Sequence, residues 1–141
     1  MRMNFEKLLN DGKIEKIEKS SPEFETVDSD LKFAEEALKL KNFEWAMVVA
    51  YNAVMRAGMK CMASFGYRAI GKEHHKHVFD FLSECGIDSV LVTYFDRIRR
   101  KRNDFVYRDT SYVSEHEAFD IISNAKLFVH KIRTFVLKKR T

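Results

Sequence analysis

The chain contains very few helix-breaking residues, and this feature constrains its fold more than any other. Its 141 residues include one proline and five glycines. In the long stretches between these breakers, apolar residues recur at intervals of three and four rather than two. Intervals of three or four place side chains on one face of an α-helix, whereas a strand requires an interval of two. The sequence therefore predicts an all-α protein, an up-and-down bundle of four to five helices.

The predicted helices follow a short N-terminal segment. They run from about Asp28 to Lys41, Phe43 to Phe65, Glu73 to Cys85, Asp88 to Tyr107, and onward from a capping box at Ser114 to Glu117. We expect Asn42 to cap the start of the second of these helices and Gly66 to end it. The segment Phe5 to Lys19 is expected to form one or two helical turns. Residues 1–141 are thus predicted to form one domain, in which residues 1–25 are a short helical extension.

Small side chains are predicted to form the centre of this bundle. Between Phe43 and Phe65 they recur at steps of four, three, four and four, at Ala46, Ala50, Ala53, Ala57 and Cys61. A stripe of this kind allows a neighbouring helix to approach closely. Cys61 and Cys85 are interpreted as small buried apolar residues rather than as a disulfide framework.

The composition favours a soluble protein of the reducing cytoplasm. The chain is 45% hydrophobic and 13% aromatic, which argues against disorder. Its longest apolar run, Trp45 to Tyr51, is far shorter than the roughly 20 residues of a membrane-spanning helix. Charged residues such as Glu6 and Lys7 stand where a signal peptide would be apolar. We therefore expect no membrane partner.

One segment concentrates positive charge. The net charge is only +4, from 25 basic and 21 acidic residues, yet six of the twelve residues from Arg97 to Arg108 are cationic. Arginine presents a planar pair of donors that matches two phosphate oxygens, so the segment favours a nucleotide or RNA phosphate as ligand. The alternative is that the flanking arginines form a solvated helix face.

Arg102 occupies a position that the helical pattern reserves for the core. Leu91, Phe95 and Ile98 define the apolar stripe, and Arg102 lies only about 40° from Ile98 around an ideal helix. Burying this charge without a partner would cost several kcal/mol. The arginine therefore needs a carboxylate inside the bundle, a subunit interface, or a cleft that receives an anion.

Three histidines form a second chemical cluster. His74 and His77 are spaced to share a helix face as two ligands of a metal ion. The alternatives are a polar helix start or a contribution to a phosphate cleft. We assign no metal and no other cofactor to the chain.

Several segments resemble the HEPN domains of prokaryotes and higher eukaryotes. The segment NFEWAMVVAYNAVMRAGMKCMASFGYR, from Asn42 to Arg68, looks like the second core helix of that family, with its Tyr-x-Ala centre at Tyr51 and Ala53. GKEHHKHVFDFL and RRKRNDFVYRD are also similar, the latter at the position of the family's Arg-x4-6-His signature. The opening MNFEKLLNDGKIEKIE is similar to archaeal-type members.

The resemblance implies a helical bundle that binds nucleotides or acts as a metal-independent ribonuclease. It also implies a homodimer whose motifs face each other across a shared cleft, and a role in a toxin–antitoxin or defence pair with a nucleotidyltransferase-like partner. The residues that it assigns to catalysis are Arg102, Asn103 and Tyr107. Those assigned to ligand binding are Arg99, Arg100, Arg102, Asn103 and Tyr51, although Tyr51 is equally well explained as a hydrogen-bonded core residue.

The sequence departs from the catalytic pattern of the family at one decisive position. Catalytic members read Arg-Asn-x-x-x-His, and here Tyr107 stands in place of the histidine. A tyrosine with a pKa of about 10 is only about 0.1% ionised at neutral pH, a handicap of about 4 kcal/mol for a general base. The tyrosine that carries adenylylation in some members corresponds to Asp109. The sequence therefore favours a binding protein, with an active ribonuclease and a protein-interaction scaffold as alternatives.

Geometry adds a condition to any joint role of Arg102 and Tyr107. Five residues separate them, which places them about 140° apart on an ideal α-helix. They can converge only if the helix is distorted before Asp109, or if two subunits each supply one wall of the cleft.

Overall fold

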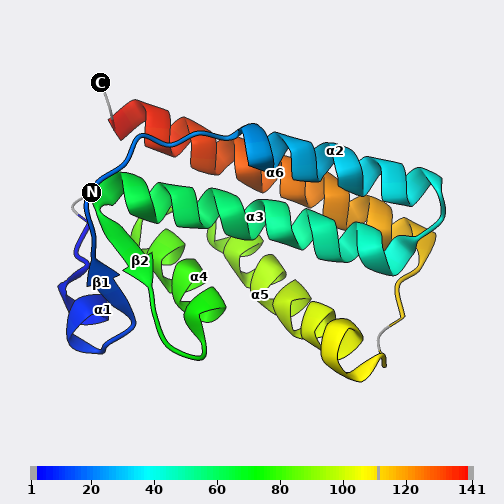
Figure 1. Cartoon of the computed structure of the whole chain (residues 1–141), viewed down its shortest axis with the longest axis horizontal. Coiled ribbons are helices and arrows are strands. Elements are labelled where there is room, and N and C mark those ends of the chain that lie inside the picture. Colours follow the sequence, from blue (N-terminus) through cyan, green and yellow to red (C-terminus); the bar gives the residue numbers. More distant parts are fainter. Residues whose placement is uncertain (1–2, 111, 140–141) are drawn as a thin grey trace.

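The computed structural model describes residues 3–110 and 112–139, which are mostly helical. The long helices are α2 (Glu25–Lys39), α3 (Phe43–Phe65), α5 (Ser89–Asn103) and α6 (Glu115–Lys139). The shorter elements are α1 (Glu6–Asn10), α4 (His74–Glu84), the π-helix η1 (Asp104–Arg108), and the strands β1 (Ile14–Lys16) and β2 (Tyr67–Ala69). In Figure 1, α2 and α6 lie along one side of α3, while α4 and α5 pack on its other side.

The small residues of α3 allow this central position. All members of the predicted stripe are fully buried: Ala46, Ala50, Ala53, Ala57 and Cys61. Large side chains of the surrounding helices are also fully buried, among them Phe81 of α4, Phe95 of α5 and Phe128 of α6. Cys85 is also buried, as predicted. The hydrophobic core is therefore built around α3.

Two of the three predicted helix-end signals are confirmed. Gly66 ends α3 with a φ of 88°, in the left-handed region that favours glycine. The Ser114 hydroxyl accepts a hydrogen bond of 3.1 Å from the Glu117 amide at the start of α6. Asn42 occupies the predicted N-cap position of α3, but its side chain makes no capping hydrogen bond there.

The N-terminal segment differs from the helical turns that the sequence predicts. Only α1 is helical there, and β1 pairs with β2 in an antiparallel register that places Ile14 opposite Ala69. Glu15 forms an ion pair with Arg68, 53 residues further along the chain. The strand buries Ile14 and closes one end of the core. A pairing between segments so far apart leaves no periodic signal in a strand of three residues.

The other helices agree with the prediction to within a few residues, with one informative exception. The helix expected to continue to Tyr107 changes type after Asn103, where η1 begins. Asp109 ends η1 with a φ of 52°. Among the described residues, no helix is both long and apolar enough to cross a membrane.

A close contact between α3 and α4 generates a stability prediction at Gly58. A Cβ at this position would lie 2.5 Å from Cγ1 of Val78 in α4, a stiff β-branched side chain. We expect Gly58→Val to lower the free energy of unfolding by about 2 kcal/mol or more, measured by urea denaturation. Met59→Val, at the exposed neighbouring position, is the matched control. Equal stability of the two variants would contradict the close approach of α3 and α4.

Candidate functional site

Four of the predicted site residues, Arg99, Arg102, Asn103 and Tyr107, line one cavity between the first turn of α4 and the end of α5. Its volume is about 520 Å³, within the range of pockets that bind small ligands. The lining residues are Lys72, Glu73, His74, His75, Lys76, Arg99, Arg102, Asn103 and Tyr107. The cavity thus joins the basic segment of α5 to the histidine cluster of α4, two features that lie far apart in the sequence.

Arg102 has no carboxylate partner among the described residues. Its Nη1 donates a hydrogen bond of 3.0 Å to Asn103 Oδ1, and its buried Nε makes no hydrogen bond in that part of the chain. The guanidinium carbon lies 5.6 Å from the centroid of the Tyr51 ring, in cation–π contact. The sequence left three environments open for Arg102, and one of them, a pair with a carboxylate inside the bundle, is therefore wrong for the described residues.

The π-helix η1 brings Tyr107 to the same cavity. The Tyr107 ring centroid lies 5.9 Å from the guanidinium carbon of Arg102. A π-helix forms hydrogen bonds between residues five apart, so residues at that spacing lie nearer to one face than in an α-helix. The distortion required before Asp109 is thus present within one chain, and a second subunit is not needed to bring the two residues together.

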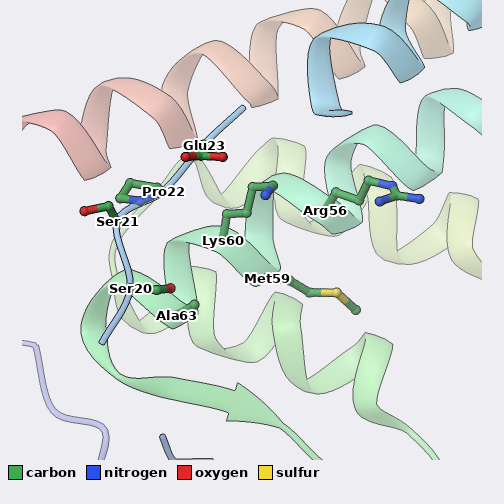
Figure 2. A pocket seen from close by; sticks show the side chains of 8 residues that line it. All are labelled: Ser20, Ser21, Pro22, Glu23, Arg56, Met59, Lys60 and Ala63. Carbon is green, nitrogen blue, oxygen red and sulfur yellow. The ribbon is translucent and has the colours of Figure 1, made fainter. Parts of the chain in front are cut away.

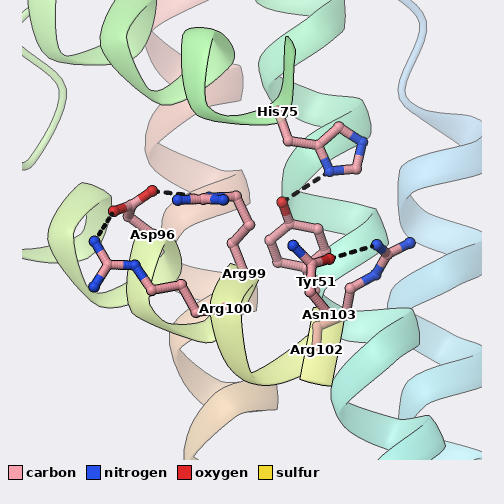
Figure 3. Close-up of polar contacts among 7 residues, drawn as sticks. All are labelled: Tyr51, His75, Asp96, Arg99, Arg100, Arg102 and Asn103. Carbon is pink, nitrogen blue, oxygen red and sulfur yellow. Dashed lines mark hydrogen bonds and ion pairs between the residues drawn. The ribbon is translucent and has the colours of Figure 1, made fainter. Parts of the chain in front are cut away.

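Tyr51 lies beneath the cavity and supports one of its histidines. It is fully buried, and its hydroxyl lies 3.1 Å from Nδ1 of His75 (Figure 3). Burial raises the pKa of Tyr51 well above its ordinary value, so the hydroxyl keeps its proton. Tyr51 is thus the hydrogen-bonded core residue of the second interpretation; it contacts Arg102 but does not line the cavity, so a direct role in ligand binding stays a prediction.

His75 is held in its neutral form. Burial lowers its pKa to about 4, and the neighbouring His74, Arg102 and Arg99 act in the same direction. A buried hydroxyl requires an acceptor, and Nδ1 of His75 lies within reach of the Tyr51 hydroxyl. We therefore assign the ring proton to Nε2, which makes the histidine a neutral hydrogen-bond donor to a ligand.

The remaining arginines differ in their access to the cavity. Arg99 lines it, but its Nε donates a hydrogen bond of 3.0 Å to Asp96. Arg100 lies outside the lining, is 71% exposed, and pairs with the same carboxylate at 3.5 Å. Figure 3 shows both arginines directed to Asp96. Asn103 uses Oδ1 for Arg102, which leaves its amide nitrogen for a ligand.

The histidine cluster does not form a metal centre in the described part of the chain. Nδ1 of His74 lies 3.2 Å from the Gly71 carbonyl, and Nδ1 of His77 lies 2.9 Å from the Ile70 carbonyl. Among the described residues, no group of three or more metal-ligating side chains comes together. The sequence marked the cluster but could not single out His75, because its contact with Tyr51 depends on the packing of α4 against α3.

A second cavity, shown in Figure 2, offers less chemistry. Its volume is about 340 Å³, and it lies between residues 20–23 and α3. Its arginine, Arg56, is already paired with Asp30 at 2.9 Å. The cavity at Arg102 is therefore the better candidate for a functional site.

Comparison with known proteins assigns no family to the chain. No protein-family model matches it, and no curated protein does. The resemblance to HEPN domains therefore stays a prediction from motifs, and the function must be inferred from the chemistry of the cavity itself.

The neutral His75 generates a prediction about stability and pH. Because its pKa is about 4 in the folded protein and about 6.5 when unfolded, only the unfolded chain binds this proton between those values. Lowering the pH from 7 to 5 should therefore reduce the free energy of unfolding. We expect His75→Gln to make this reduction smaller in urea denaturation at the two pH values.

His130→Gln provides the matched control, because His130 is exposed on α6. This variant should keep the pH dependence of the parent protein. The same reduction in both variants would show that His75 is not the group responsible.

Proposed function

We propose that the chain is a nucleotide- or RNA-binding protein of the HEPN type, which holds a phosphate in the cavity at Arg102. The unpaired guanidinium is the observation that carries this proposal. A partly buried cation without a carboxylate partner is costly, and an anionic ligand would offset that cost. Arginine is suited to two phosphate oxygens at once.

Most of the other lining residues are consistent with such a ligand, and Glu73 is the one carboxylate in the lining. Lys72 and Lys76 add positive charge at the edge of the cavity, while the Asn103 amide and His75 Nε2 supply neutral donors. Tyr107 is 73% exposed, so its ring is free to stack on a base. The site thus combines contacts for a phosphate with a surface for the base beside it.

The binding proposal predicts different effects of two neighbouring arginines. Arg102→Ala should weaken binding of a short labelled RNA by about 1.5–3 kcal/mol, through loss of a charge-assisted phosphate contact. Arg100→Ala removes the same charge from a side chain directed away from the cavity, so it should have a much smaller effect. Fluorescence anisotropy measures both dissociation constants.

Salt dependence separates phosphate contacts from other modes of binding. The logarithm of the binding constant should fall with the logarithm of salt concentration, by about 0.7 per phosphate contact on a single strand. If the Arg102→Ala variant folds normally and binds the RNA as tightly as the parent protein, the assignment of this arginine to a phosphate contact is wrong.

Metal-independent ribonuclease activity is the second candidate. Its supporting observation is the position of Tyr107 beside Arg102, where the motif of catalytic members carries histidine. Cleavage needs a base that takes the 2′-hydroxyl proton and a cation that stabilises the charged phosphorane. Arg102 supplies the cation, but Tyr107 stands where the motif histidine would act as the base, and the assigned tautomer of His75 leaves that ring no free lone pair. The binding function is therefore favoured.

The distinction predicts a gain of activity in one variant. Tyr107→His places a group with a pKa of about 6.5 beside Arg102, and we expect weak cleavage of a labelled RNA that the parent protein binds without cleaving. The double variant Tyr107→His with Arg102→Ala should be inactive. Cleavage by the parent protein, with growth arrest on expression that Arg102→Ala abolishes, would favour the ribonuclease instead.

The assembly of the protein is proposed on the basis of the resemblance alone. A homodimer would place two such cavities across a shared cleft, and a nucleotidyltransferase-like protein would be the partner in a toxin–antitoxin or defence pair. A scaffold that binds only proteins is the remaining alternative, and RNA binding that depends on Arg102 would exclude that role as its sole function.

A further inference from the structure

The two cysteines of the chain lie against each other where α4 packs on α3. Both are free thiols, and both are buried, Cys61 completely and Cys85 with 6% of its surface exposed. Cys61 belongs to the last two turns of α3, and Cys85 directly follows the last residue of α4. Their side chains are hydrogen-bonded to each other. The two sulfur atoms are therefore neighbours, although the residues lie far apart in the sequence.

The packing of α3 against α4 explains this contact. The Tyr51 hydroxyl of α3 meets His75 of α4, 24 positions further along the chain. Gly58 faces Leu82, since a Cβ on the glycine would lie 3.3 Å from Cδ1 of the leucine. Both pairs have the same separation in sequence as the two cysteines, so equivalent positions of the helices stay side by side. The cysteines occupy the next turn after Gly58, where the backbones approach closely.

We propose that Cys61 and Cys85 are a redox pair, which a peroxide converts into a disulfide that joins α3 to α4. Burial in a core explains either cysteine alone, because a free cysteine packs like a small apolar residue. It does not explain why the two thiols are in contact. A disulfide needs Cα atoms about 4.4–6.8 Å apart, and helices packed on small residues come within that range. This inference does not depend on the proposed function.

The reaction consumes one peroxide and no other oxidant. The sulfur of Cys85, the less buried of the two, attacks one oxygen of hydrogen peroxide; the O–O bond breaks, and a sulfenic acid and one water form. The sulfur of Cys61 then attacks the oxidised sulfur, the S–O bond breaks, and the thiol proton leaves in a second water. Two thiols and one peroxide thus give one disulfide and two waters. The sulfurs are oxidised and the peroxide oxygens are reduced.

The environment of the pair makes the first step slow. The hydrogen bond from Cys61 and burial both raise the pKa of the Cys85 thiol, so little of the reactive thiolate is present at neutral pH. The pair therefore responds to sustained oxidation and is not a rapid sensor. The same burial protects the disulfide from reducing thiols once it has formed, because exchange requires access to a sulfur atom.

Hydrogen peroxide added to the folded parent protein tests the proposal. After quenching, the protein is unfolded in urea and its remaining thiols are alkylated with iodoacetamide. We expect both cysteines of the monomer to escape alkylation, and a digest without reductant to contain the Cys61 peptide joined to the Cys85 peptide. Dithiothreitol should restore both thiols. This reversal distinguishes a disulfide from sulfinic and sulfonic acids, which dithiothreitol does not reduce.

Urea denaturation measures the effect on the fold. The disulfide closes the chain segment that contains β2 and α4, so the midpoint of the oxidised protein should be higher by about 1 M or more than after reduction with dithiothreitol. Oxidised methionines such as the exposed Met59 contribute equally to both samples. Cys85→Ala is the matched control, because it leaves one thiol. Its midpoint should not change when dithiothreitol is added after peroxide.

Three results would overturn the redox pair. They are thiols that stay alkylatable after prolonged exposure, oxidation that dithiothreitol does not reverse, and a disulfide that forms only when urea is present during the peroxide treatment. The cysteines lie at the opposite end of α4 from its first turn, which lines the cavity at Arg102. RNA binding by the oxidised protein should therefore equal that of the reduced protein, and failure of either proposal leaves the other intact.

Discussion

The close packing around α3 is the constraint on which the rest of the structure depends. A helix surrounded by four others can be accommodated only if its own side chains are small at the contacts, and the alanines of α3 and Gly58 meet this need. The same helix carries Tyr51 and Trp45. Its central position therefore determines where Arg102 finds an aromatic surface and where η1 is held. The packing of the core and the position of the candidate site therefore both depend on α3.

A change of helix type converts the end of α5 from a structural element into part of a cavity. In a continuous α-helix, Arg102 and Tyr107 would point in different directions. The wider turn of η1 brings them together, and Phe105 within that turn packs against Trp45. Such π-turns are rare and frequently occur at functional sites. The distortion here places Tyr107 in the cavity lining and holds Phe105 against Trp45 of α3.

The charge distribution in the cavity supports the proposed binding of an anion. Asp96 pairs with Arg99 and Arg100, whereas Arg102 has no carboxylate partner among the described residues. His75 stays neutral because it is buried beside other cations, and the Tyr51 hydroxyl orients it as a donor. A general base near neutral pH would need a free lone pair on the ring, which this hydrogen bond does not leave. The ring of His75 is therefore not suited to act as a general base, which supports the proposal of a binding function.

The sequence by itself determined the helical class, the bounds of α3, the cap at Ser114 and the unusual position of Arg102. These properties depend on intervals of three and four and on residues close to one another in the chain. The β1–β2 pair, the π-turn after Asn103, and the contact between His75 and Tyr51 emerged only in the tertiary structure. Each depends on contacts between distant segments, whose energies leave no periodic trace in the sequence. For the same reason, the sequence indicated that Arg102 needed a compensating environment, but only the packing of α3, α4 and α5 showed that this environment contains no carboxylate partner among the described residues.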